Sequence, residues 1–449
     1  MTKCEVNENE LHKIALGACF LGSGGGGKLE TSFTFIKNYC DNLSEDEKKR
    51  KIQIVDLKDA TAEQSGIVVA YMGAPQKMDC IKCPNAVCEG IKKFMKGKGK
   101  LNYIIPVEIG PVSTITACLT AHKMNIPVLN VDGAGRAVPT LDLISYTTNA
   151  HVSVNPTFLC SENENENENK KPPEAPVYHQ IKLEIFGDKK PGAVFSEDTD
   201  SGAASKMESL ARPVLNMAEF DQKAGLVMWY FDDVTKLMAP HASVKGTLTF
   251  CQELGGAIQS KPTIEDVFRD IEELFKNQPT YDGLSIYPTI KEICRGTLKS
   301  ATTSTAGGFD VGVITIEAET KADDGSEHLY TIIFQNESLI LWDSLSATPL
   351  IMAQDLISYL IEDDEKQYVF TNGDIMDGNT LKGDLAGKKI VVYGIAAPCA
   401  LRQSEANIMN KRKDILRNTS ADVEPNELPK HYMSILNTVG YYGEYVQLK

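Results

Sequence analysis

Four adjacent glycines, Gly24 to Gly27, are the first feature of the sequence that could take part in chemistry. A helical pattern over residues 9–21 precedes them, and a second one begins near Leu29. Glycine loses more backbone entropy on folding than any other residue, but it lets backbone amides approach a ligand closely. The positive end of the second helix would face the same place. We therefore weigh a loop that binds an anion or an oxyanion against a flexible turn.

Two acidic residues follow predicted strands at the points where those strands end. Glu108 follows a strand over residues 102–107, and Asp132 follows one over residues 126–131. Ligands of open α/β sheets bind at the carboxyl ends of the strands, so either carboxylate could act as a general base or hold a hard metal ion. The alternatives are a structural partner of a backbone amide for Glu108 and an ion pair with Arg136 for Asp132.

We predict that these segments form one site. Its catalytic residues would be Glu108, Asp132 and Arg136. Its substrate-binding backbone would come from Gly24, Gly25, Gly26, Gly27, Gly110 and Gly133. The sequence identifies no cofactor, and a divalent metal ion held by Asp132 and Glu108 stays an open alternative.

Other reactive residues fit the interior of the protein better. Cys19 beside the glycines could be a nucleophile, but its helical spacing favours burial. Cys80 and Cys83 have a zinc-like spacing without a second pair at finger distance, so we expect ordinary thiols. His122 lies on an apolar helix face and is expected in the core.

Alternating apolar runs and helical patterns predict an α/β N-terminal domain with a mostly parallel sheet, over residues 1–160. Residues 161–176 have a repetitive Asn-Glu composition and read as a low-complexity linker or insertion. Residues 177–449 are expected to form a second, mixed domain, helical to about residue 285 and β-rich from about 286 to 449.

Charge and hydropathy narrow the choice of partners. The 449 residues include 46 basic and 61 acidic side chains, a net charge of −15. This balance argues against nucleic acid as a partner, which needs a clustered basic surface. No apolar run is long enough for a membrane span, and the first residues lack the features of a signal peptide. We expect a cytoplasmic protein with a small-molecule substrate and leave its oligomeric state open.

The order of three motifs resembles one family. LGSGGGG, PVEIG and PVLNVDGAGRAVP are similar to segments of the S-methyl thiohydantoin desulfurase family, which is associated with hydantoinases and oxoprolinases. The likeness continues through residues 241–258 and residues 334–337. It implies an α/β domain followed by a β-rich domain, action on hydantoin-like rings, and a hydantoinase- or oxoprolinase-type partner. Three positions depart from the family pattern, namely Lys28, Pro111 and Thr140.

We therefore expect a hydrolase-like protein that acts on a hydantoin, an S-methyl thiohydantoin or a related cyclic amide. Water activated by Glu108 or Asp132 would attack the ring carbon between the two nitrogens. The glycine amides and Arg136 would hold the developing negative charge. The alternative from another class is a non-catalytic metabolite-binding or accessory subunit of a hydantoinase- or oxoprolinase-type enzyme.

Overall fold

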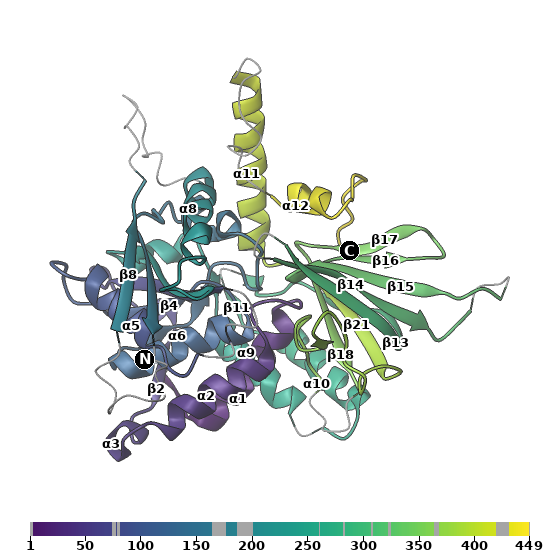
Figure 1. The fold of residues 1–449 in the computed structure, drawn as a ribbon, viewed down its shortest axis with the longest axis horizontal. Helices are drawn as coiled ribbons and strands as arrows, with labels where there is room; N and C mark the ends of the chain where they lie inside the picture. The colour runs from purple at the N-terminus through teal and green to yellow at the C-terminus, as the bar shows by residue number, and fades with distance from the viewer. Residues whose placement is uncertain are drawn as a thin grey trace.

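Two large β-sheets lie side by side in the computed structural model (Figure 1). We call the portion built on the first sheet the α/β part and the portion built on the second sheet, residues 290–395, the β part. The structure describes residues 3–73, 78, 81–163, 177–185, 201–259, 261–281, 283–306, 309–321, 325–362, 368–418 and 431–448.

The first sheet has eight strands and mixed direction. Its strands follow the order β1 (Lys3–Val6), β2 (Ile52–Val55), β5 (Val128–Leu129), β4 (Tyr103–Pro106), β3 (Gly66–Gly73), β9 (Lys223–Phe231), β7 (Thr157–Asn163) and β8 (Val177–Leu183). Only β2, β5, β4 and β3 are parallel to one another. The other neighbours pair antiparallel. The predicted mostly parallel sheet is therefore right for these four strands and wrong for the rest, because β9 and the β7–β8 hairpin add to the open edge beside β3.

The low-complexity segment does not separate the two sheets. Strands β7 and β8 pair with each other on either side of it, and β9 continues the same sheet. The first sheet thus extends past residue 160, where the sequence suggested a boundary. Residues 164–176, most of the low-complexity segment, lie outside the described residues.

Both faces of the first sheet are buried. Along β3, Ile67 and Val69 point into one core and Val68 and Ala70 into the other, which explains why this strand is continuously apolar. The first core is shared with α1 (Glu8–Leu21), α2 (Leu29–Asp41), α5 (Asn85–Phe94), α6 (Pro111–Met124), α9 (Thr247–Ile258) and α10 (Ile264–Asn277). The second is shared with α7 (Ser145–Thr148), α8 (Ser201–Val214), α11 (Cys399–Asn418) and α12 (Tyr432–Thr438).

The second sheet is antiparallel throughout, so the predicted β-rich region is confirmed over residues 290–395, whereas the described elements after it are helices and not strands. Its centre is the 17-residue strand β13 (Ile290–Ala306), which pairs on one side with β14 (Phe309–Ala318). On the other side β13 pairs with β20 (Thr380–Leu381) and β21 (Lys389–Ile395). The remaining strands are β15 (Leu329–Gln335), β16 (Glu337–Asp343), β17 (Thr348–Met352), β18 (Leu356–Ile361) and β19 (Met376–Asp377).

Short elements complete the described chain. They are the pairs β6 (Val131–Asp132) with β10 (Val244–Lys245) and β11 (Thr280–Tyr281) with β12 (Leu284–Ser285), the helix α3 (Glu45–Lys48), and the 3-10 helices η1 (Leu57–Asp59), η2 (Leu141–Leu143) and η4 (Val234–Met238). Within the described residues, no helix combines the length and the apolar character that crossing a membrane requires.

Candidate functional site

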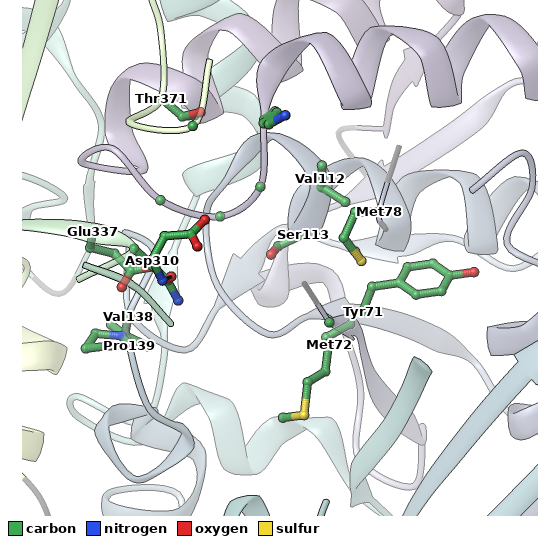
Figure 2. A pocket seen from close by; sticks show the side chains of 18 of the residues that line it. Tyr71, Met72, Met78, Val112, Ser113, Val138, Pro139, Asp310, Glu337 and Thr371 are labelled. Carbon is green, nitrogen blue, oxygen red and sulfur yellow. Dashed lines mark hydrogen bonds between the residues drawn. The ribbon is translucent and has the colours of Figure 1, made fainter. Parts of the chain in front are cut away.

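A cavity of about 860 Å³ lies where the α/β part meets the β part. The α/β part supplies the glycine tract, the ends of β3 and β4, the segment Val138–Leu141 and one side of α8. The β part supplies residues from β13, β14, the β15–β16 turn and the loop before β19. In Figure 2, Glu337 and Asp310 of the β part and Tyr71 and Met72 of β3 stand on different sides of this space.

The glycine tract is held in place by close packing on both sides. An added Cβ at Gly24 would collide with the Asn372 side chain, and one at Gly25 would collide with the Glu337 carboxyl group. The backbone of Gly26 lies directly against that of Gly110. Gly24 and Gly26 also have positive φ angles of 86° and 78°, which side-chain-bearing residues rarely adopt. The tract is thus a closely packed wall of the cavity.

Several amides of this loop have no acceptor among the described residues. The Gly25 amide donates to the Gly22 carbonyl at 3.1 Å, and the Gly24 and Gly26 carbonyls accept from the β part and from α6. Within the described chain, the amides of Gly24, Gly26 and Gly27 donate to no protein group. These three amides are therefore the donors that the loop can offer to a ligand.

The start of α2 differs from the expectation. The amides of Leu29 and Glu30 donate to the carboxylate of Asp374, at 2.9 Å and 3.3 Å. The same carboxylate accepts from the amide and the hydroxyl of Thr371. Since an internal carboxylate from the β part already caps this helix, its first turn does not serve as the anion site.

Glu108 lies at the carboxyl end of β4 and lines the cavity. One carboxyl oxygen accepts from the Ser113 hydroxyl at 3.0 Å, and the other accepts from the Val138 amide at 2.8 Å. Burial and, next, the charge of Glu337 raise the pKa of Glu108 to about 8. The side chain is half-buried and faces the cavity, so it can exchange a proton with a ligand there.

Glu337 is one of three cavity carboxyls that sequence reasoning missed, beside Glu208 and Asp310. It follows the tight turn at Asn336, whose φ is 56°, and begins β16. Its side chain is 3% exposed, and one carboxyl oxygen has no hydrogen-bond partner among the described residues. Burial raises its pKa to about 7, opposed by the charge of Arg136. The available signal was the polar triplet QNE between the apolar runs LYTIIF and SLILW.

Asp132 and Arg136 lie beside the cavity and do not line it. The amides of Ala134 and Gly135 donate to one Asp132 oxygen at 2.8 Å and 2.5 Å. Burial raises the pKa of Asp132 to about 6. Arg136 is fully buried and donates to backbone carbonyls, including those of Gln354 and Asp355 in the β part. The two charged groups therefore do not form the ion pair that was the alternative.

The structure thus brings together only part of the predicted site. Glu108 and the tract Gly24–Gly27 share one cavity. Gly110 lies behind the tract, and Gly133 packs against Ile144 and Val107, so neither reaches the cavity wall. The chain that follows Asp132 and Arg136 lines the cavity further along, at Val138 to Leu141.

Models of known protein families match most of this chain. A model of the S-Me-THD-like N-terminal domain matches residues 9–170, and a model of the S-Me-THD-like C-terminal domain matches residues 202–409. The chain belongs to the S-Me-THD-like family. The resemblance inferred from the three motifs is thereby confirmed.

A solved structure supports the same fold for this S-Me-THD-like chain. The crystal structure of a protein from Chromobacterium violaceum is similar, with a TM-score of 0.72 and 26% sequence identity. The likeness covers 99% of this chain and 100% of that one. No curated protein matches the chain.

Two of the three departures from the family pattern lie in the cavity wall. Lys28 and Thr140 both line it, and in the described part of the chain the Thr140 hydroxyl has no hydrogen-bond partner. Pro111 instead forms the first turn of α6, a position that suits proline because its missing amide proton would have no intrahelical acceptor. The departures at positions 28 and 140 therefore change the lining that a ligand would meet.

The remaining candidates have structural surroundings. Cys19 is buried, and burial raises the pKa of its thiol well above the usual range. Cys80 lies outside the described residues, while the Cys83 thiol donates to Glu162 at 3.7 Å. His122 bonds to the Tyr39 hydroxyl at 2.7 Å in the core. Over the described ranges, no group of three or more His, Cys, Asp or Glu side chains is arranged to hold a metal ion.

Proposed function

We propose that this S-Me-THD-like protein hydrolyses hydantoin-like rings, with S-methyl thiohydantoins as a fitting class of substrate. The observation that carries the proposal is the pair of carboxyl groups on one cavity. The pKa of Glu108 is raised to about 8 and that of Glu337 to about 7. Two interacting carboxyls whose pKa values are raised to different extents can act as an acid and a base at neutral pH.

The roles follow from the two pKa values. As a water oxygen bonds to the ring carbon between the nitrogens, Glu337 takes a proton from it and passes this proton to the ring nitrogen. As the C–S bond breaks, Glu108 gives its proton to the departing methanethiolate. Glu108 then takes back the proton of the new hydroxyl when the carbonyl forms. The products are the ring carbonyl and methanethiol, and both carboxyls return to their starting states.

Backbone amides supply the second element of the proposed mechanism. The amides of Gly24, Gly26 and Gly27 donate to no protein group within the described chain and can donate hydrogen bonds to negative charge that develops on the ring. Preorganised donors of this kind stabilise a transition state because they need no reorientation during the reaction. In this proposal Asp132 and Arg136 take no part in proton transfer, and their hydrogen bonds stabilise the fold of the loop that leads to Val138.

The test is turnover by carboxyl variants. Glu108→Gln and Glu337→Gln should each lower kcat about 10²–10⁴-fold, because a neutral amide neither donates nor accepts the proton. Asp132→Asn is the matched control, with nearly unchanged activity per folded molecule, since it lies off the cavity and keeps the acceptor for Ala134 and Gly135. Loss of activity in Asp132→Asn together with normal activity in Glu337→Gln would indicate that Asp132 is the general base.

The pH profile gives an independent check. Activity needs Glu337 ionised and Glu108 protonated, so kcat/KM should be highest between pH 7 and 8 and fall on both sides. Should the unmutated protein turn over no hydantoin, S-methyl thiohydantoin or lactam, with or without divalent metals, the non-catalytic binding or accessory subunit becomes the better proposal.

A further inference from the structure

The cavity is much larger than a five-membered ring requires. Its volume of about 860 Å³ lies toward the upper end of the ~300–1,000 Å³ range of pockets that enclose drug-sized ligands. A bare hydantoin would leave most of this space to water. The size therefore indicates a ligand with a substantial group attached to the ring.

The chemistry of the cavity changes from one side to the other. The carboxyl pair and the glycine tract form a polar side, and Figure 2 shows Glu337 and Asp310 there. The same view shows Met72 and Met78 across the open space from these two carboxyls. We call this opposite side the apolar end, and it is formed by Tyr71, Met72 and Met78.

The apolar end is suited to a hydrocarbon or aromatic group. Tyr71 donates its hydroxyl to the Cys83 carbonyl at 3.4 Å, and its ring packs edge-on against Phe35 at 6.3 Å. Its polar atom is therefore already bonded within the protein. Met72 and Met78 are flexible and polarisable, so they adjust to differently shaped apolar groups and contact aromatic rings favourably.

The charged side chains Arg212 and Lys28 of the cavity wall are not placed to bind an acidic substituent at the apolar end. The Arg212 guanidinium at the cavity wall is already paired with the buried carboxylate of Glu208 and lies over the Phe309 ring. Lys28 lies beside the glycine tract and Gly373, on the polar side. An acidic group at the apolar end would lose its hydration without gaining a partner among Tyr71, Met72 and Met78.

We infer that the substrate is a hydantoin-like ring with an uncharged, bulky apolar substituent, of about leucine to phenylalanine side-chain size, seated on the apolar end. This inference rests on the proposed function for the position of the ring at the carboxyl pair. A ring of this kind corresponds to the cyclised form of an apolar amino acid, whose side chain becomes the ring substituent.

The experiment measures binding and turnover of a ring series by calorimetry and by product release. The series has hydrogen, isobutyl, benzyl and carboxymethyl at the same ring carbon, on both hydantoin and S-methyl thiohydantoin. Benzyl and isobutyl rings should bind at least about tenfold more tightly than the unsubstituted ring, because burying such a side chain is strongly favourable. The carboxymethyl ring should bind most weakly.

Variants locate the effect. Met72→Gln keeps the shape but adds polarity, and it should reduce the preference for benzyl over hydrogen to less than about threefold. Met217→Gln is the matched control, because Met217 is 43% exposed and does not line the cavity. Met72→Trp, which fills the apolar end, should reduce the same preference and serves if the first variant is poorly folded.

The outcomes separate the two proposals. Equal binding of all four rings, or tightest binding of the carboxymethyl ring, overturns the inference about the substituent. Selective binding of benzyl and isobutyl rings without any turnover supports the inference and overturns the hydrolase. Absence of binding by every ring overturns both.

Discussion

At the scale of single residues, Glu108 and Glu337 make the stability of the protein depend on pH. Burial raises the pKa of each carboxyl above the value of 4.5 for an exposed glutamate. The folded protein therefore binds these protons more tightly than the unfolded chain does. The resulting stabilisation is fully present below pH 4.5 and is lost as the pH rises through about 7 for Glu337 and about 8 for Glu108.

We predict that Glu337→Gln stabilises the protein at alkaline pH. Glutamine stays neutral, so the variant avoids the cost of an ionised buried carboxylate, on the order of 1–3 kcal/mol at pH 8.5. At pH 5 the Glu337 carboxyl is protonated in the folded protein, so the free energies of unfolding of the two proteins should differ little through its charge. Denaturant unfolding at both pH values measures the difference. Glu327→Gln, at an exposed ion pair with Lys299, is the control and should show no such gain at pH 8.5.

An equal loss of stability at both pH values would contradict the prediction. It would mean that the Glu337 carboxyl contributes through its shape and contacts and not through its protonation. The gain at pH 8.5 would show that burial raises the pKa of Glu337 toward neutrality, as the proposed mechanism needs for a general base.

The residues that the sequence could identify are those set by local structure. Glu108 and the glycine tract stand at chain positions where a strand or helix ends, and such positions can be recognised in one segment. Glu337 comes from the other sheet, about 230 residues further along the chain. Its place opposite Gly25 depends on how the two parts pack. No local pattern carries that information.

Arg136 shows the opposite error. A charged residue beside glycines suggested a ligand site, yet its guanidinium is fully buried and bonds to carbonyls of the β part. Sequence pattern alone does not distinguish a charge that meets a ligand from one that holds two parts together.

At the scale of elements, α1 and α9 cross at a point where no side chains intervene. An added Cβ at Gly17 would collide with the Cys251 carbonyl, and one at Gly255 would collide with the Lys13 carbonyl. These helices border the core under the first sheet. The glycine that follows Gly255 has open space around it, so the same helix carries a natural comparison.

We predict opposite effects of alanine at the two adjacent glycines of α9. Gly255→Ala should destabilise the protein by about 1–3 kcal/mol, because the helices must move apart to admit the methyl group. Gly256→Ala should stabilise it by about 0.5–1 kcal/mol, because alanine costs less backbone entropy in a helix and meets no atom within 4 Å. Thermal or denaturant unfolding of both variants measures this. Equal effects would show that the helices are not in the close contact described.

Element type was more predictable than strand direction. The predicted strand over residues 66–72 and the predicted helix from Ser113 have their counterparts in β3 and α6, although α6 begins earlier, at Pro111. The direction of β7 and β9 was not predictable, because an apolar run reads the same in a parallel and an antiparallel strand. The direction of an added strand depends on how the chain returns to the edge of the sheet that the parallel strands leave open, here beside β3.

At the scale of the whole molecule, the β part completes the glycine loop of the α/β part. The Asn372 amide donates to the Gly24 carbonyl at 2.9 Å, and Asp374 caps α2 just after the tract. The Ser338 amide donates to the Ser23 carbonyl at 2.8 Å. Since both parts contribute walls and fix the loop between them, the cavity exists only when they are joined.

Arg136 is the clearest single link between the two parts. Arg136→Lys should destabilise the protein by about 2–4 kcal/mol, because an ammonium group cannot reach the carbonyls of Ala137, Gln354 and Asp355 together as the planar guanidinium does. Activity per folded molecule should be largely kept below the lowered melting temperature, since the cavity carboxyls are intact. Arg269→Lys, whose side chain is 69% exposed in an ion pair with Asp266, should change the melting temperature little. Thermal unfolding and turnover, measured together, check this. An unchanged melting temperature with lost turnover would contradict the structural role and would indicate that Arg136 stabilises the transition state.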